Sequence, residues 1–214
     1  MKVFQIPVNP FQMNSYIYFD ENTKEGVIFD PAVYTSAEEE QIKKLIEDNG
    51  IKIKYIINTH GHIDHILGNK FAKDYFKVPI LMNEKDMPFY KGVEKQKLLY
   101  GLNFPALPPI DEFIDENSKI SFGDIEFKIL YTPGHSPGSL TFIDDKNKNI
   151  FCGDVIFKDS IGRTDLPFGD TDTLMNSIEN ILLPQVEDDY TLHPGHMDIT
   201  TVGREKQFNP FISV

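Results

Sequence analysis

The sequence predicts a mixed α/β fold in which packed β-sheets are covered by helices on the outside. Stretches rich in β-branched and aromatic residues fall into two groups, one in each half of the chain. Amphipathic helical patterns are interleaved with the strands of both groups. No low-complexity linker or internal repeat separates the two halves, so we expect one domain that spans residues 1–214.

The first half of the chain alternates between predicted strands and predicted helices. A helix is expected over residues 36–49, because Ser36 and Glu39 suit a capping box and Gly50 stands just past the end. A second helix is expected over residues 65–76, where large apolar residues recur every four positions. The predicted strands of this half are residues 2–6, 15–19, 26–31 and 52–59.

The second half begins with a stretch that is difficult to interpret, because prolines interrupt residues 83–110. A helix is expected near 92–99, ending at Gly101, and another over 170–183, with Asp170 or Thr171 as its N-cap. The turn "DDKNKN" predicts a hairpin between two of the later strands. The predicted strands of this half are residues 125–132, 139–144, 149–154 and 190–196.

The amino-acid composition limits which binding partners and which cellular compartment are expected for this protein. The chain carries 33 acidic and 21 basic residues, a net charge of −12, which argues against a nucleic-acid partner and favours simple solubility. Cys152 is the only cysteine, so no internal disulfide is expected, and we predict that it packs inside a strand. Neither a signal peptide nor an apolar run of membrane-spanning length is visible, which predicts a cytoplasmic protein without membrane contact.

The stretch "NTHGHIDH", residues 58–65, holds three of the six histidines of the chain. His60 and His62 are two positions apart, so in an extended segment their side chains point to the same side. Asp64 and His65 follow at the predicted start of a helix. Zinc binds imidazole nitrogen and carboxylate oxygen, so the stretch is either half of a metal site or a solvated polar turn.

Three further candidate ligands stand in a similar place, just after a predicted strand. They are His135 in "YTPGHSPGSL", Asp154 in "NIFCGDVIF" and His196 in "LHPGHMD". Each of them alone is typical of an ordinary turn. Because loops at one edge of a sheet are where ligand sites gather, the shared position predicts that they join the histidine-rich stretch in one site.

At this point the sequence resembles a known family. "THGHIDH", "TPGHSPGS", "FCGDVIF" and "HPGHMDITTVGRE" resemble the successive motifs of the metallo-β-lactamase superfamily, in the same order, and "FDPA" resembles its early Asp-Pro. "SIGRTDLPFGD" and the late "NPF" are most similar to the glyoxalase II-type hydrolases of that superfamily. The resemblance implies a four-layer αββα sandwich with a dinuclear metal site.

The resemblance also implies a role for each candidate ligand. His60, His62 and His135 would hold a first divalent metal ion, Asp64, His65 and His196 a second, and Asp154 would bridge the two. We expect zinc, with iron or manganese as alternatives. No side chain is then expected as the catalytic nucleophile, since a metal-held hydroxide would take that role. His193 matches no motif position and is interpreted as a strand-end residue.

Arg163 is a candidate for substrate binding, because in the glyoxalase II-like group a cation here lies near the mouth of the site. The alternative is a surface arginine paired with Asp165 or Asp170. "GHM" and "DPA" stand where the family often has "GHG" and "DPG". The sequence ends ten residues after Arg204, without the helical domain that helps longer glyoxalase II enzymes hold glutathione, so we expect shallow binding of the thiol carrier.

The sequence motifs are compatible with several functions. The expected one is hydrolysis of a small-molecule thioester such as an S-acylglutathione. A persulfide dioxygenase with a single iron, a metal-dependent lactonase or esterase, and a binding protein without activity are the alternatives. Residues 134–138 also match the G-x-S-x-G pattern of serine hydrolases, but Ser136 would precede a strand instead of the required helix. The oligomeric state is not predicted.

Overall fold

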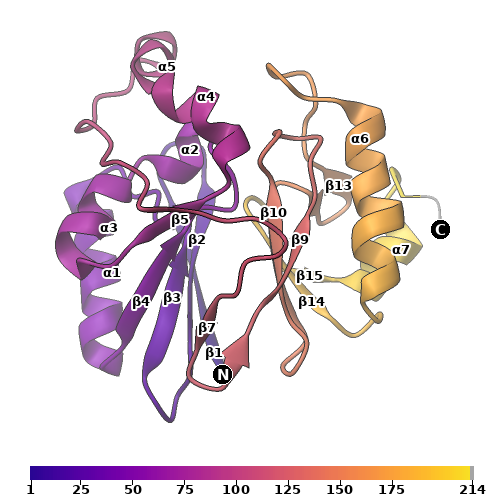
Figure 1. Cartoon of the computed structure of the whole chain (residues 1–214), viewed down its shortest axis with the longest axis horizontal. Coiled ribbons are helices and arrows are strands. Elements are labelled where there is room, and N and C mark those ends of the chain that lie inside the picture. The colour runs from indigo at the N-terminus through magenta and orange to yellow at the C-terminus, as the bar shows by residue number, and fades with distance from the viewer. Residues whose placement is uncertain (213–214) are drawn as a thin grey trace.

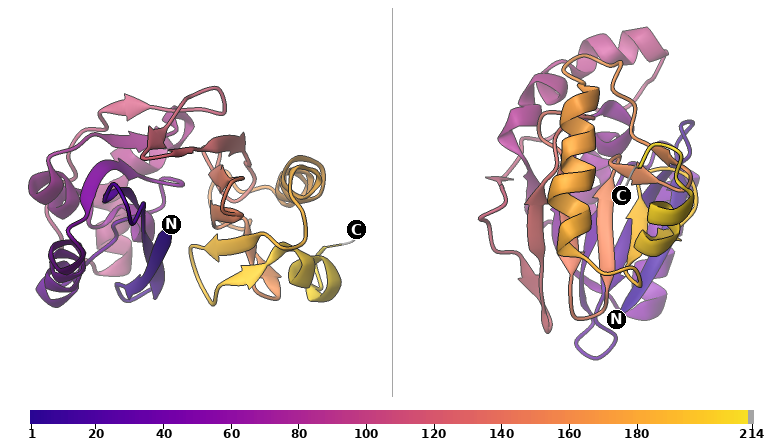
Figure 2. Two further views of the ribbon diagram at one scale, coloured as in Figure 1. Left: turned by 90° about the horizontal axis from the view of Figure 1, so that it is seen from below. Right: turned by 90° about the vertical axis from the view of Figure 1, so that its right-hand side faces the viewer.

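The computed structural model describes residues 1–212 and has four layers (Figure 1). Two β-sheets face each other in the middle, and helices cover the outer face of each sheet (Figure 2). This arrangement confirms the αββα sandwich that the sequence motifs imply. Residues 213 and 214, which the predicted domain includes, lie outside the described residues.

The first sheet has six strands in the order β1-β2-β3-β4-β5-β6. Its first three strands are antiparallel, and β3 to β6 run parallel. Strand β2 is buried along its whole length: Ile17 and Phe19 point to the helical side, and Tyr16 and Tyr18 to the other sheet. The strands are β1 Lys2–Val8, β2 Met13–Phe19, β3 Glu25–Phe29, β4 Lys52–Ile57, β5 Ile80–Met82 and β6 Glu112–Phe113.

The second sheet has five strands in the order β15-β14-β11-β10-β9. Phe142 and Phe151 point toward the first sheet and fill the space between the sheets, while Ile143 and Ile150 point to the helices outside. Cys152 is buried within β11, as predicted, and packs on the helical side of the sheet. The strands are β9 Lys128–Tyr131, β10 Leu140–Asp144, β11 Asn149–Gly153, β14 Thr191–Pro194 and β15 Thr200–Thr201; two small ribbons pair β7 Ser121–Phe122 with β8 Ile125–Glu126 and β12 Ile156–Phe157 with β13 Ser160–Ile161.

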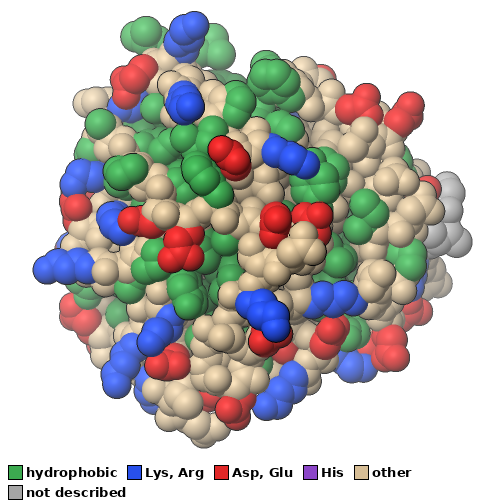
Figure 3. All heavy atoms as spheres, in the orientation of Figure 1, with side chains coloured by type: hydrophobic (Ala, Val, Ile, Leu, Met, Phe, Trp, Pro, Cys, Tyr) green, Lys and Arg blue, Asp and Glu red, His purple; other side chains and the backbone are tan. Residues whose placement is uncertain are grey.

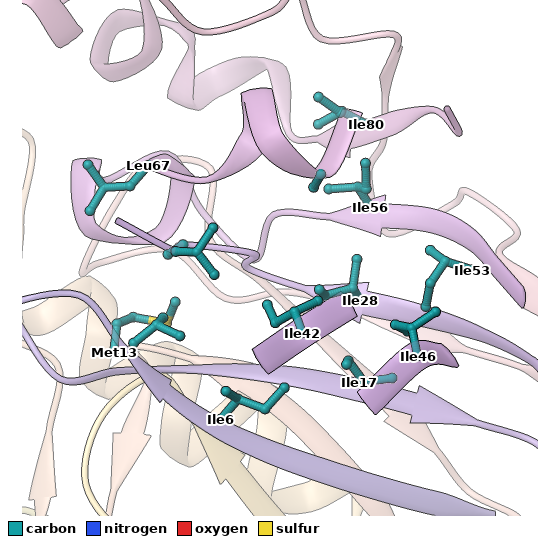
Figure 4. Close-up of a cluster of buried hydrophobic side chains, with 14 of the residues drawn as sticks. Ile6, Met13, Ile17, Ile28, Ile42, Ile46, Ile53, Ile56, Leu67 and Ile80 are labelled. Carbon is teal, nitrogen blue, oxygen red and sulfur yellow. The ribbon is translucent and has the colours of Figure 1, made fainter. Parts of the chain in front are cut away.

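Helices α1 and α3 cover the first sheet, and α6, its continuation and α7 cover the second (Figure 1). Ile42 and Ile46 of α1 lie on the isoleucines of the strands beneath them (Figure 4). The helices are α1 Ser36–Asn49, α2 Ile63–Ile66, α3 Asn69–Phe76, η1 Glu84–Asp86, α4 Met87–Lys91, α5 Val93–Tyr100, α6 Thr171–Asn176, η2 Ser177–Leu182, η3 Leu183–Gln185 and α7 Val202–Phe208.

Several predicted boundaries need correction. The capping box of α1 uses Thr35 and Glu38, one position before the predicted pair, because the hydroxyl of Thr35 accepts from the Glu38 amide. The helix predicted over 65–76 is two helices, because the backbone leaves the helical conformation at Gly68, where φ is −92° and ψ is 8°. The strand predicted over 125–132 is divided into β8 and β9. Asp170 is confirmed as the N-cap of α6.

No helix among residues 1–212 is long and apolar enough to cross a membrane.

Candidate metal centre

The seven candidate ligands come from the segments that follow β4, β9, β11 and β14. The segment after β4 carries His60 and His62 and leads directly into α2, which carries Asp64 and His65. His135 follows β9, Asp154 follows β11 directly, and His196 follows β14. A backbone hydrogen bond from the Leu140 amide to the Thr59 carbonyl joins the two sheets at this end. The topology therefore brings both halves of the sequence to one edge of the sandwich.

Three imidazoles converge in the first group of donors. The Nε2 atom of His135 lies 2.8 Å from Nδ1 of His62 and 3.2 Å from Nε2 of His60. All three rings are buried, and each is edge-on to the others. Three nitrogens that face one another in a dry site are satisfied together by a single cation, because zinc binds imidazole nitrogen at about 2.0–2.1 Å in a tetrahedral arrangement.

The second group contains Asp64, His65 and His196. The Nε2 atom of His196 lies 3.1 Å from a carboxylate oxygen of Asp64, and Nε2 of His65 lies 3.9 Å from the same oxygen. His65 is fully buried, whereas the side chains of Asp64 and His196 are 19% and 21% exposed. This group therefore faces the opening of the site, and the first group lies deeper.

Asp154 lies between the two groups. One of its carboxylate oxygens is 3.4 Å from Nε2 of His65, and the other is 3.5 Å from Nε2 of His135 and 3.6 Å from Nε2 of His196. A single carboxylate thus reaches donors of both groups, which is the position of a bridging ligand.

Unpaired buried atoms test whether this donor set fits a metal. Nε2 of His65 and Oδ1 of Asp154 are buried without a hydrogen-bond partner among the described residues. Leaving such atoms unpaired costs about 1–3 kcal/mol each, and a divalent cation between them would satisfy both. Imidazole and carboxylate donors suit zinc, iron and manganese. The residues present therefore fit two divalent metal ions.

Neighbouring groups fix the orientation of the candidate ligands. Nδ1 of His65 lies 2.9 Å from a carboxylate oxygen of Asp30, which also accepts from the hydroxyl of Thr59. Nδ1 of His135 lies 2.8 Å from the backbone carbonyl of Arg163. Such contacts orient metal-binding imidazoles and raise their basicity. From the sequence, Asp30 was recognised only as part of "FDPA", and this orienting role was not predicted. Its position directly after strand β3, like that of the candidate ligands after their strands, was the signal that could have indicated it.

The loop that carries His196 approaches Asp154 closely. A Cβ atom at Gly195 would lie 2.2 Å from Oδ1 of Asp154 and 2.7 Å from a ring carbon of His65. Only glycine allows this approach, so the "PG" that precedes His196 has a direct geometric role.

The charges of the site are matched to cation binding. Burial holds the pKa of His60 well below its ordinary value and lowers the pKa of His62 to about 3, so both imidazoles are neutral donors. Burial also opposes ionisation of Asp154, but the charge on His65 outweighs it and holds the pKa of Asp154 well below its ordinary value. His60, His62 and Asp154 are therefore in the protonation states that metal binding requires. His65 differs, because burial opposes its charge but the charges of neighbouring carboxylates outweigh burial and raise its pKa well above the ordinary value, so a bound cation would displace its proton.

The remaining candidate residues fall into different places. Arg163 is exposed and makes a two-bond ion pair with Asp165, with both N–O distances at 2.7 Å. Ser136 is buried, and its hydroxyl donates to a carboxylate oxygen of Asp86 at 2.8 Å. Strand β10 follows Ser136 instead of a helix, which agrees with the rejection of the serine-hydrolase pattern. His193 is buried in β14.

A pocket of about 560 Å³ opens over the candidate metal ligands. Its lining includes Asp64, His135, Asp154 and His196 together with apolar residues and Arg163. Both donor groups are thus reachable by a small molecule from outside. No histidine side chain of the described residues is visible on the face drawn in Figure 3, and all of them except His196 are buried.

Comparison with known proteins decides the family. The family model described as the metallo-beta-lactamase superfamily matches residues 8–196. The chain belongs to this superfamily. Membership covers all seven candidate ligands and places the chain among the metal-dependent hydrolases.

Relatives in the metallo-beta-lactamase superfamily match over the whole chain. Hydroxyacylglutathione hydrolase GloC of Haemophilus influenzae is 38% identical, over 100% of this chain and 99% of that protein. Among solved structures, BLEG-1 B3 metallo-beta-lactamase is 33% identical, with a TM-score of 0.89 over 98% of this chain and 99% of its own. TTHA1623 in a di-iron-bound form is 31% identical, with a TM-score of 0.86 over 98% and 100% of the two chains.

Proposed function

We propose that the protein hydrolyses small-molecule thioesters at a site that holds two divalent metal ions. The observation that carries this proposal is the pair of donor groups joined by Asp154, whose oxygens lie 3.4–3.6 Å from His65, His135 and His196. A site for one ion would need only one of the groups. Here both are complete, and both are reached from one pocket.

In this proposal His60, His62 and His135 hold one ion, Asp64, His65 and His196 hold the other, and Asp154 bridges them. Bound metal ions of this kind lower the pKa of a water molecule and polarise a carbonyl group. The chain itself supplies the orientation of the ligands. Asp30 and the carbonyl of Arg163 accept the second ring protons of His65 and His135, which leaves the opposite nitrogens free to bind.

Asp64 has a further role in the proposal. Its carboxylate is partly exposed at the floor of the pocket and lies 3.1 Å from His196. A carboxylate in this position can accept a proton from a water molecule that enters the pocket and can hold that water for attack on a carbonyl carbon. Because the ions and Asp64 supply activation and orientation, no serine or cysteine nucleophile is needed.

The similarity to hydroxyacylglutathione hydrolase GloC supports a thioester of an anionic thiol carrier as the substrate. Arg163 lines the pocket and can contribute a positive charge to that carrier. Its ion pair with Asp165 already compensates much of this charge, so we propose a weak contribution.

A β-lactam is a second candidate substrate. The observation that favours it is the similarity to BLEG-1, whose structure is described as a B3 metallo-beta-lactamase. Both reactions need attack of an activated water on a carbonyl carbon, so the same metal centre serves either one.

One set of measurements separates these functions. Metal content of the purified protein is determined together with initial rates on an S-acylglutathione, a β-lactam and a lactone, and oxygen uptake is followed with glutathione persulfide. We expect about two ions per chain and the highest kcat/KM on the thioester. One iron per chain with oxygen uptake would instead identify a persulfide dioxygenase, and a higher kcat/KM on the β-lactam or the lactone would replace the thioester as substrate.

A further inference from the structure

A second pocket, of about 280 Å³, adjoins the pocket above the candidate metal centre. It lies between α4, α5 and the segment 166–168. His62, Ile63 and Asp64 line both pockets, so the two share a wall that contains two candidate metal ligands. The second pocket is therefore within reach of a molecule bound over the candidate metal ligands.

The second pocket is mainly apolar. Phe89, Leu99 and Phe168 form much of its lining, together with prolines of both flanking segments. The ring of Phe89 is edge-on to His62 at 4.5 Å and edge-on to Phe168 at 5.6 Å. Aromatic contacts thus run from a candidate metal ligand to the outer rim of the pocket.

The rim exposes large apolar side chains to solvent. Leu99 is 76% exposed and Phe168 is 66% exposed. Figure 3 shows hydrophobic side chains at the top of the molecule, where α5 lies in Figure 1. Large apolar side chains exposed around a pocket are typical of binding sites.

The backbone of Phe168 is held in a strained conformation. Its φ is +68°, in the left-handed region that bulky residues rarely adopt. Hydrogen bonds from the Gly169 amide to the Leu166 carbonyl, and from the Asp170 amide to the Gly134 carbonyl, hold this turn in place. A strained residue that keeps a largely exposed ring beside a pocket indicates a role in binding.

We propose that this pocket receives an apolar acyl group, so that the enzyme prefers thioesters of medium-length aliphatic acids over those of short or polar acids. The inference rests on the proposed thioester hydrolysis and names the part of the substrate that the chain selects. Continuity with the candidate metal centre favours a substrate group over a second copy of the chain, because His62, Ile63 and Asp64 line both pockets.

The test uses thioesters of one neutral carrier, N-acetylcysteamine, with acetyl, butanoyl, hexanoyl and octanoyl groups. Full burial of a methylene group corresponds to about a fourfold change in binding, so in a partly open pocket kcat/KM is expected to rise about twofold to fourfold per methylene. A wild-type protein that hydrolyses all four thioesters with equal kcat/KM would overturn the proposal.

Neighbouring leucines on α5 provide a matched pair of variants. Leu98 is 86% exposed and Leu99 is 76% exposed, but only Leu99 lines the pocket. Leu99→Ser is expected to remove most of the dependence on chain length, whereas Leu98→Ser keeps it. Phe168→Gly is a second test, because glycine adopts the left-handed backbone without strain and the fold is retained. Equal effects of Leu98→Ser and Leu99→Ser would contradict the proposal.

A binding measurement separates this inference from the proposed function. S-alkyl thioethers of N-acetylcysteamine, with two to eight alkyl carbons, cannot be hydrolysed and are titrated into the protein by calorimetry. Tighter binding of the longer thioethers, lost in Leu99→Ser, supports the apolar pocket even if no thioester is hydrolysed. Thioester hydrolysis with thioether binding that is independent of length would overturn the pocket and leave the proposed function standing. A dimer that Leu99→Ser dissociates, without any change in length dependence, would assign the surface to a second copy instead.

Discussion

The carboxylate of Asp86 accepts a hydrogen bond of 2.7 Å from the backbone amide of Gly61, the residue between His60 and His62. The same buried carboxylate accepts from the Gly138 amide at 2.6 Å and from the Ser136 hydroxyl at 2.8 Å. It therefore joins the loop of the first two candidate ligands to the loop that carries His135. A Cβ atom at Gly61 would lie only 2.8 Å from the Asp86 side chain, so the loops fit around this one residue.

Asp86→Ala is expected to loosen both loops. The change leaves the buried amides of Gly61 and Gly138 without an acceptor, whereas the hydroxyl of Ser136 can still donate to a neighbouring hydroxyl. That neighbour is Ser139, at 2.8 Å. Each unpaired donor costs about 1–3 kcal/mol. We expect a loss of about 3–5 kcal/mol in the free energy of unfolding, measured by urea titration, with weaker metal binding. Asp86→Asn keeps an acceptor oxygen, so it should retain part of the stability and part of the metal affinity. Unchanged metal affinity in a folded Asp86→Ala protein would show that the loops hold their positions without this residue.

Removal of a candidate ligand is expected to abolish hydrolysis without unfolding the chain. His60→Ala and Asp154→Ala remove donors from the site but leave the hydrophobic clusters intact, so the far-UV circular dichroism should stay native-like. Metal content per chain and the thioester rate should both fall. Ser136→Ala is the control, with a loss of less than about tenfold expected if the metal centre does the chemistry. A larger loss, above about a hundredfold, would revive the serine-hydrolase interpretation.

The sequence predicted the candidate ligands because each one follows a strand and stands in a short local motif. Asp86 could not be found in this way. Its hydrogen-bond donors are far away in the sequence: Gly61 lies 25 residues before it, and Ser136 and Gly138 lie 50 and 52 residues after it. Asp86 also belongs to the proline-interrupted stretch, where the sequence was most difficult to interpret. The short strand β5, the edge strand β6 and helix α7 were also missed. Elements this short form because of the surfaces they contact, and their own periodicity carries little information.

Asp30→Asn is expected to weaken metal binding at the second group of donors. Asparagine tolerates the left-handed backbone of this position, where φ is +45°, so the fold should be kept. The amide no longer provides a negative charge beside Nδ1 of His65, which orients that ring and raises its basicity. Loss of such a partner typically costs about tenfold to a hundredfold in metal affinity.

The measurement for Asp30→Asn is competition with a chelator of known affinity. Asp159→Asn is the matched control, because Asp159 also has a left-handed backbone, with φ of +62°, and its carboxylate pairs with Arg204. Its metal affinity should equal that of the wild type. Equal metal affinities for the wild type and both variants would show that Asp30 does not contribute to metal binding.

Arg163→Ala is expected to raise KM for an acylglutathione modestly, by about twofold to fivefold, with kcat nearly unchanged. An exposed ion contact contributes about 0.2–1 kcal/mol to binding. Because Arg163 is already paired with Asp165, its contact with the carrier should lie in the lower part of this range. Asp165→Ala frees the guanidinium and should lower KM instead. Both effects should shrink at high salt and should be absent with N-acetylcysteamine thioesters. An Asp165→Ala protein with unchanged KM at low salt would show that Arg163 does not contact the carrier.

His193 is expected to make stability depend on pH between about 4 and 6.5. It is stacked on Phe151 with ring centroids 4.7 Å apart, Nε2 lies 2.8 Å from Oδ1 of Asn149, and Nδ1 is buried without a partner among the described residues. Burial therefore lowers the pKa of His193 to about 4, since a proton on Nδ1 would find no acceptor. In the unfolded chain the pKa is about 6.5.

The sign follows from the depressed pKa in the folded state. Above pH 6.5 the imidazole is neutral in both states, and its full contribution to stability is present. As the pH falls from 6.5 through 4, the unfolded chain takes up a proton that the folded chain does not, so the free energy of unfolding decreases by about 2–4 kcal/mol. Urea titrations of wild type and His193→Gln at a series of pH values isolate this contribution, because the other titrating groups are common to both proteins. Between pH 6.5 and 4, we expect the free energy of unfolding of His193→Gln to fall by about 2–4 kcal/mol less than that of the wild type. Parallel curves for the two proteins would show that folding does not shift the pKa of His193.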